Sequence, residues 1–179
     1  NTNTFTPNMI VVAVQVPDAC CPGTWQLTAT VMDILSKWPY RIDWNRIYMT
    51  GLSYGAATIM NYIQQTPDAQ FKKPAAVAIM SINMTPLCGN YYSGTWALCG
   101  NDLRFATIPT WAFCGTQDAF YEFQTKYVAL MTAAKYPVKY TTAVEGHGPW
   151  AQWLDPKFGL YDWFLTNSNA PVNKPPVAN

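Results

Sequence analysis

Residues 46–63 read RIYMTGLSYGAATIMNYI. The first half of this stretch is an apolar, β-prone run that ends in Gly-x-Ser-x-Gly, and the second half is typical of a helix. A sharp strand-to-helix turn of this kind displays its serine, here Ser53, just past the end of a strand. Side chains at Gly51 and Gly55 are expected to collide with the neighbouring strand and helix, because the chain reverses over a single residue. The stretch therefore predicts a strand, an exposed Ser53 and a helix in direct succession.

Apolar strands and amphipathic helices alternate along the rest of the chain. Most of the predicted strands are unbroken apolar runs, which is typical of strands covered on both faces. The predicted strands cover residues 9–16, 47–50, 75–82, 108–114 and 138–144, and the predicted helices cover residues 25–38, 54–64, 119–135 and about 157–166. This alternation predicts an α/β domain with a mostly parallel sheet and helices on both faces.

The composition fits one domain and argues against several classes of partner. The chain has 179 residues, of which 50% are apolar and 12% are charged, enough for a single hydrophobic core. Its net charge is only +1 and it has no cluster of Lys and Arg, so the sequence does not predict binding to nucleic acid or to an anionic membrane. No apolar run is long enough to cross a membrane. One histidine and no Cys-x-x-Cys pair argue against the common metal sites, so neither a metal nor a cofactor is predicted.

Three residues suited to nucleophilic and acid–base chemistry follow three different predicted strands. Besides Ser53, these are Asp118 in Gly-Thr-Gln-Asp and His147 in Glu-Gly-His-Gly. Ligands of parallel α/β sheets bind beyond the carboxyl ends of the strands. A serine hydroxyl needs a base, and His147 is the only histidine, although it could also be an incidental surface residue. The favoured partner for its other ring nitrogen is Asp118. The competing carboxylates are Asp102, Glu122, Glu145 and Asp155.

The motifs GLSYG, WAFCGTQD and EGHGPW together resemble extracellular α/β-hydrolases of the predicted-peptidase and carboxylesterase type. These are relatives of feruloyl esterases and polyhydroxybutyrate depolymerases, and the resemblance covers about residues 9–166. It implies the α/β-hydrolase fold, whose chain order is also Ser, Asp, His. It implies that Ser53 is the nucleophile, Asp118 the acid and His147 the base. It further implies that the backbone N–H of Tyr54 is one donor of an oxyanion hole.

The resemblance also implies a segment that these residues do not contain. Such hydrolases have a strand ending in His-Gly, whose loop gives the second oxyanion donor, and no His-Gly precedes Ser53. In the family that strand lies between the strands predicted here at 9–16 and 47–50. Without it, buried backbone groups would stay unpaired, at a cost of about 1–3 kcal/mol each. We therefore expect the front strands of the fold to be missing from this chain, and an upstream segment or a companion chain to complete the sheet.

The two ends of the chain suggest a longer, exported protein. Residues 1–166 are expected to form the C-terminal portion of the hydrolase domain. Residues 167–179 are rich in Pro and Asn and are typical of an extended linker to a further module. That tail resembles the approach to a PKD-type immunoglobulin-like module. Together with the family resemblance it predicts a secreted or cell-surface bacterial protein.

Five cysteines are moderately many for a cytosolic protein. Cys88 and Cys99 flank a loop, and a disulfide bond between them, which would close that loop, is predicted. Cys20 and Cys21 are adjacent and are not expected to pair with each other. Cys114 is favoured as a small buried apolar residue, and its pairing with one of those two stays open.

These observations predict a serine hydrolase that cleaves carboxylic esters, on small molecules or on a polymer, through an acyl-enzyme. Trp25, Trp96 and Trp150 are predicted to bind substrate, with core or loop packing as the alternative. Two other functions stay open: a serine peptidase with the same three residues, and a catalytically silent binding or assembly module. Ester hydrolysis is expected to become faster as His147 loses its proton, at about pH 6.5.

Overall fold

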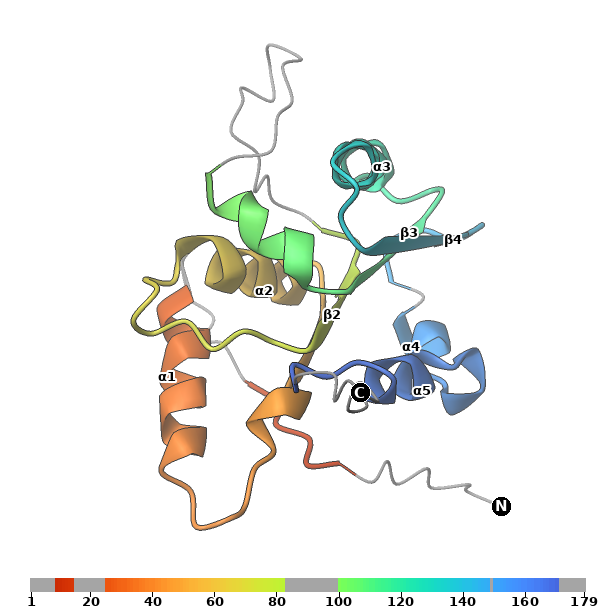
Figure 1. The fold of residues 1–179 in the computed structure, drawn as a ribbon. Coiled ribbons are helices and arrows are strands. Elements are labelled where there is room, and N and C mark those ends of the chain that lie inside the picture. The colour runs from red at the N-terminus through yellow and green to blue at the C-terminus, as the bar shows by residue number, and fades with distance from the viewer. Residues whose placement is uncertain (1–8, 15–24, 83–99, 149, 171–179) are drawn as a thin grey trace, which may run out of the picture.

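Four parallel strands form the sheet that organises the described part of the chain (Figure 1). The structure is a computed structural model and describes residues 9–14, 25–82, 100–148 and 150–170. The strands are β1 (Tyr48–Leu52), β2 (Ala76–Met80), β3 (Thr110–Gly115) and β4 (Val138–Ala143). They pair in chain order, so each crossover moves the same way across the sheet. Right-handed crossovers in one direction place the connecting helices on a single face.

Helices cover both faces of this sheet (Figure 1). The first face carries α1 (Trp25–Ser36), α2 (Tyr54–Gln65), the 3-10 helix η3 (Gly100–Thr107) and α3 (Tyr121–Ala133). The opposite face carries α4 (Trp150–Trp153) and α5 (Leu160–Leu165). Two short 3-10 helices, η1 (Trp44–Arg46) and η4 (Pro156–Phe158), precede β1 and α5 in the chain. The predicted mostly parallel sheet with helices on both faces is confirmed.

Side chains of the central strands pack into the apolar core on both faces of the sheet. All five positions of β2 are buried. Val77 and Ile79 pack with the α1, α2 and α3 side chains, whereas Ala76, Ala78 and Met80 pack with α5. Alternate residues of a strand point to opposite faces, so an unbroken apolar run is what a sheet covered on both sides requires.

The predicted strand over residues 9–16 is wrong for residues 9–14, which form no strand. Ile10 and Val11 are 62% and 71% exposed. A β-branched run becomes a strand only where a neighbouring strand supplies backbone partners. β1 is the edge strand of the sheet and pairs only with β2 among the described residues. Residues 15 and 16 lie outside the described residues.

The last predicted helix, at about 157–166, is divided into η4 and α5. Pro156 is the first residue of η4, and Gly159 has a φ of 85°, a left-handed conformation that ends one helix and precedes the next. Leu160 and Phe164, four residues apart on α5, are both buried, as expected of an amphipathic helix. The break was missed because periodicity does not report the turn chemistry of Pro and Gly.

The start of the predicted linker is bonded to the domain. The Tyr48 hydroxyl donates to the Asn167 carbonyl at 2.9 Å. Asn169 donates its backbone N–H to Asn45 O at 2.9 Å and its side-chain amide to Lys73 O at 2.8 Å. Residues 171–179 lie outside the described residues. In the ranges that are described, no helix is long and apolar enough to cross a membrane.

Candidate active site

Ser53 occupies a strained turn between β1 and α2. Its backbone has φ 54° and ψ −114°, a conformation that a non-glycine residue rarely adopts. Its N–H donates to the Met80 carbonyl of β2 at 2.8 Å, and its own carbonyl accepts from the Ala57 N–H at 3.0 Å. The turn is therefore fixed from the sheet on one side and from the helix on the other. Strain held in this way is typical of functional sites.

The two glycines near Ser53, Gly51 and Gly55, differ in how much room there is for a side chain. A Cβ at Gly51 would lie 2.4 Å from the carbonyl carbon of Gly55, so strand and helix approach closely only because Gly51 has no side chain. A Cβ at Gly55 would meet no described atom within 4 Å. The expected collision is confirmed for Gly51 and wrong for Gly55, because the close approach uses the Gly55 backbone and not the space beside its Cα.

Asp118 and His147 form a hydrogen-bonded pair beyond β3 and β4. The distance from His147 Nδ1 to Asp118 Oδ2 is 2.9 Å. The Asp118 side chain is fully buried, whereas the His147 side chain is 40% exposed. With Nδ1 turned to the carboxylate, Nε2 is the ring nitrogen left to accept a proton from an alcohol.

Two loops must touch for this pair to form, and Gly115 allows it. A Cβ at Gly115 would lie 2.1 Å from the Glu145 carbonyl oxygen and 2.4 Å from that of Gly146. The Thr116 N–H donates to Ala143 O at 2.8 Å, and the Gln117 N–H donates to Glu145 O at 2.9 Å. The turn that carries Asp118 is thus joined by backbone hydrogen bonds to the loop that carries His147.

The surroundings of Asp118 favour its charged form. Burial alone raises the pKa of the Asp118 carboxyl, but hydrogen-bond donors outweigh burial and bring this pKa below its ordinary value. The Phe120 N–H, which lies 2.9 Å from Oδ1, contributes most to this lowering of the pKa, and the neighbouring Ser81 hydroxyl and the hydrogen-bonded His147 ring act in the same direction. An ionised Asp118 can hold His147 in one tautomer and stabilise its protonated form.

Two of the other candidate carboxylates, Glu122 and Asp155, have other roles. Glu122 pairs with Lys126 at 2.5 Å, one turn along α3. Asp155 accepts from the Lys157 N–H at 2.8 Å and begins η4. The side chain of Asp102 lies outside the described residues. Asp118 is therefore the carboxylate for which a hydrogen bond to His147 is present.

Aromatic side chains flank His147. The Phe120 ring lies edge-on to the imidazole, with centroids 5.4 Å apart. Trp150 begins α4 and is 47% exposed, and its Cδ1 is the atom that a Cβ at Gly148 would approach, at 3.7 Å. Tyr54 is exposed at the start of α2. Phe120 therefore offers apolar surface beside the imidazole, and Trp150 lies close to Gly148, the residue that follows His147.

The other two predicted tryptophans are placed differently. Trp25 begins α1, in the layer that packs against α2. Trp96 lies outside the described residues.

Cys114 is a buried free thiol directly before Gly115. Burial, with the negative charge of Asp118 adding to it, raises the pKa of Cys114 to about 12. The expectation that Cys114 is a small buried residue is confirmed. The predicted Cys88–Cys99 bridge, Cys20 and Cys21 lie outside the described residues. Across the described ranges, no three His, Cys, Asp or Glu side chains are grouped so as to hold a metal ion.

The sequence analysis missed two residues at this site. Ser81 follows β2 and contributes to the charge state of Asp118, but nothing except its place after a buried strand marks it in the sequence. Phe120 was not among the residues predicted above to act at the site. Its position two residues after Asp118 would have been a usable signal.

Comparisons with known proteins address the fold. No family model and no curated protein sequence matches this chain. Solved structures do match. A thermostable esterase has a TM-score of 0.57 at 24% identity, over 79% of this chain and 36% of that one. An S-formylglutathione hydrolase from Staphylococcus aureus has a TM-score of 0.56 at 16% identity, over 79% of this chain and 60% of that one. A ferulic acid esterase has a TM-score of 0.56 at 18% identity, with the same coverages of 79% and 60%.

These likenesses concern only part of the solved proteins. The chain spans 36% to 60% of the length of these three structures. At such identities the similarity is one of fold. The parallel sheet, the helices on both faces and these structural neighbours agree, and the chain has an α/β-hydrolase fold.

Proposed function

We propose that this chain carries the catalytic residues of a serine hydrolase that cleaves carboxylic esters. The observation that carries the proposal is the 2.9 Å hydrogen bond between Asp118 and His147. It forms at the carboxyl end of the sheet, where Ser53 is also displayed in a strained turn. A nucleophile, a base and a group that orients the base are the three components that acyl transfer needs.

The proposed reaction uses each residue in turn. The Ser53 hydroxyl oxygen attacks the ester carbonyl carbon while His147 Nε2 takes the hydroxyl proton. The Tyr54 N–H, at the amino end of α2, donates to the oxyanion, which the helix dipole also favours. His147 returns the proton to the leaving alcohol, and the acyl group stays on Ser53. Water then attacks the acyl carbon with His147 again as base, releasing the acid and restoring Ser53.

The flanking aromatic residues suit a substrate with an apolar acyl or aryl group. The Phe120 ring lies edge-on to His147, and the exposed Trp150 lies close to the next residue, Gly148. Esters are proposed ahead of amides because the structural neighbours include esterases.

A direct test compares the chain with Ser53→Ala on p-nitrophenyl esters and on the matching p-nitroanilides. We expect ester hydrolysis that falls by at least about 10³-fold in Ser53→Ala, because removing a nucleophile removes the acyl-enzyme route. Faster turnover of the anilides would favour the serine peptidase. Equal ester hydrolysis by both proteins would contradict the proposal and leave a binding role.

We also propose that the outer edge of β1 pairs with a further strand, from an upstream segment or from a companion chain. Among the described residues β1 pairs on one side only, and the apolar residues Ile10, Val11, Val12 and Val14 are exposed. A loop from that strand would supply the second oxyanion donor. Backbone amides of β1 should exchange with solvent faster in this chain alone than in the presence of the segment or companion chain that supplies the further strand. Equal exchange in both would contradict the pairing.

A further inference from the structure

Ser81 has a backbone conformation that its position does not explain. It is the first residue after β2, it is completely buried, and its φ is 48°. Ser53 and Lys135 are the other non-glycine residues with positive φ in the described ranges. Lys135 lies in an exposed turn after α3, whereas Ser81, like Ser53, follows a strand at the carboxyl end of the sheet. Strained backbone persists where the surroundings enforce it, and it concentrates at functional sites.

Hydrogen bonds on both sides hold Ser81 in this conformation. Its own N–H donates to the Phe113 carbonyl at 2.8 Å. The next N–H, that of Ile82, donates to Gln124 Oε1 at 3.0 Å. Gln124 is fully buried, and its Nε2 donates to the same Phe113 carbonyl at 2.8 Å. The amide of Gln124 thus joins α3 to the ends of β2 and β3 and holds the backbone on either side of the Ser81 Cα.

Ser81 follows β2, and Asp118 follows β3, the strand that pairs with β2, so the two residues lie at the same end of neighbouring strands. The Ser81 hydroxyl oxygen is buried and has no hydrogen-bond partner among the described residues. Yet it is close enough to the Asp118 carboxylate and to the Cys114 thiol to favour the charged form of both. A buried hydroxyl without a regular partner is costly unless a nearby acceptor uses it. The carboxylate of Asp118 is the strongest acceptor within its reach.

We propose that Ser81 is a positioning residue whose hydroxyl donates to the Asp118 carboxylate and keeps Oδ2 aimed at His147. This inference rests on the proposed function of the Asp118–His147 pair. Phe120 N–H occupies Oδ1 of that carboxylate, so a second donor on the buried side restricts its rotation. The carboxylate then presents one orientation to the imidazole.

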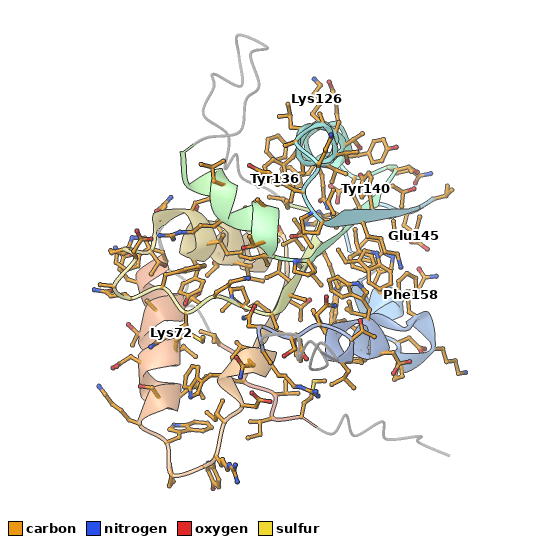
Figure 2. The ribbon with its side chains drawn as sticks, in the orientation of Figure 1. Lys72, Lys126, Tyr136, Tyr140, Glu145 and Phe158 are labelled. Carbon is orange, nitrogen blue, oxygen red and sulfur yellow. The ribbon has the colours of Figure 1, made fainter. Side chains whose placement is uncertain are left out.

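The titratable groups around the pair are few. The Cys114 thiol and the Tyr140 phenol both have a pKa raised to about 12, chiefly by burial, and are uncharged at working pH. Tyr121 begins α3 and lies near Tyr140. Figure 2 shows Tyr140 between α3 and the sheet and Glu145 beyond the end of β4. Glu145, on the exposed loop before His147, is the carboxylate nearest in sequence to the imidazole.

Three substitutions at Ser81 distinguish the effect of the hydroxyl from the effect of the strained backbone. Ser81→Ala and Ser81→Gly both remove the hydroxyl, but glycine adopts a φ of 48° without strain. Ser81→Thr keeps the hydroxyl. The control is Thr66→Val, because the Thr66 hydroxyl is also buried without a regular partner and lies at the far end of α2.

The main measurement is the NMR titration of His147. The chain has one histidine, so its imidazole signals are unambiguous. Without the Ser81 hydroxyl the carboxylate has one donor fewer and attracts the imidazolium more strongly. We expect the midpoint to rise by about half a pH unit in both Ser81→Ala and Ser81→Gly, a fraction of the one to three units that a whole charge partner causes. Ser81→Thr and Thr66→Val should keep the wild-type midpoint.

Ester hydrolysis supplies the second measurement. In Ser81→Ala and Ser81→Gly, kcat should fall about tenfold with KM nearly unchanged, part of the 10²–10⁴-fold that a positioned base contributes. An unchanged midpoint in both variants, or a change in Ser81→Ala alone, would overturn the proposal. The midpoint is read without substrate. A raised midpoint with no Ser53-dependent hydrolysis would therefore count against the proposed function and support the positioning role.

Discussion

Single residues decide whether the proposed catalytic groups can meet. Asp118 and His147 lie on different loops, and those loops touch only where Gly115 leaves room for the Glu145 and Gly146 carbonyls. The buried carboxylate is then surrounded by donors, which lower the pKa of Asp118 in spite of burial. The site therefore depends on the lack of a side chain at Gly115 and on a few hydrogen bonds to Asp118.

Gly115→Ala should separate the two loops. The added Cβ would lie 2.1 Å from a backbone oxygen, so the 145–147 loop must shift. We expect ester hydrolysis to fall about 10²-fold, as misplacement by about 1 Å can cause, and the free energy of unfolding to fall by about 1–3 kcal/mol. Gly146→Ala is the matched control, because a Cβ there meets no described atom within 4 Å. Similar losses in both variants would contradict this explanation.

The charged state of Asp118 should make stability depend on acid pH. Its pKa in the folded protein lies below the ordinary value of 3.8, so ionised Asp118 favours the folded state above that pH. The contribution is lost as the pH falls below 3.8 and through the folded value. Urea unfolding of wild type and Asp118→Asn should therefore show a difference in stability that shrinks at low pH. A difference that grows on acidification would disprove the assignment.

The strand-to-helix turn is the element that fixes Ser53. β1 ends, the chain reverses over one residue, and α2 begins with its backbone against Gly51. The Ser53 N–H continues the hydrogen bonding between β1 and β2 past the end of the strand. The serine is therefore placed by the sheet as well as by the helix.

The two glycines of this turn should respond oppositely to alanine. Gly51→Ala places a Cβ 2.4 Å from the Gly55 backbone and should lower the free energy of unfolding by about 1–3 kcal/mol. Gly55→Ala adds a Cβ in open space within α2 and should be neutral or stabilising by up to about 1 kcal/mol. Thermal unfolding of the two variants measures this. Destabilisation by Gly55→Ala as large as that by Gly51→Ala would refute it.

Most elements could be predicted from the sequence because their signals are local. β2 and β3 are apolar at consecutive positions, and the Gly-x-Ser-x-Gly turn carries its own geometry. The failures depend on the rest of the molecule. Residues 9–14 have strand composition, but a strand also needs a partner strand. The role of Ser81 depends on the side chains that follow β3, which no local pattern describes.

At the scale of the whole molecule, a parallel sheet collects distant residues at one edge. Ser53, Ser81, Asp118 and His147 follow β1, β2, β3 and β4 in that order. The layers on the two faces bury the strands and leave their carboxyl ends for chemistry. The alternating strands and helices of the sequence predict this arrangement. Where each side chain lies beyond its strand depends on loop contacts that only the structure reveals.

The central claim is that His147 activates Ser53 for attack on a carbonyl. A fluorophosphonate probe tests it most directly, because it phosphonylates a serine that a base has activated, with loss of fluoride. We expect peptide mass mapping to find the label on Ser53 of the wild-type chain, and labelling to slow by at least about 10²-fold in His147→Ala. A Ser53 that stays unlabelled, or that is labelled at the same rate without His147, would contradict the account.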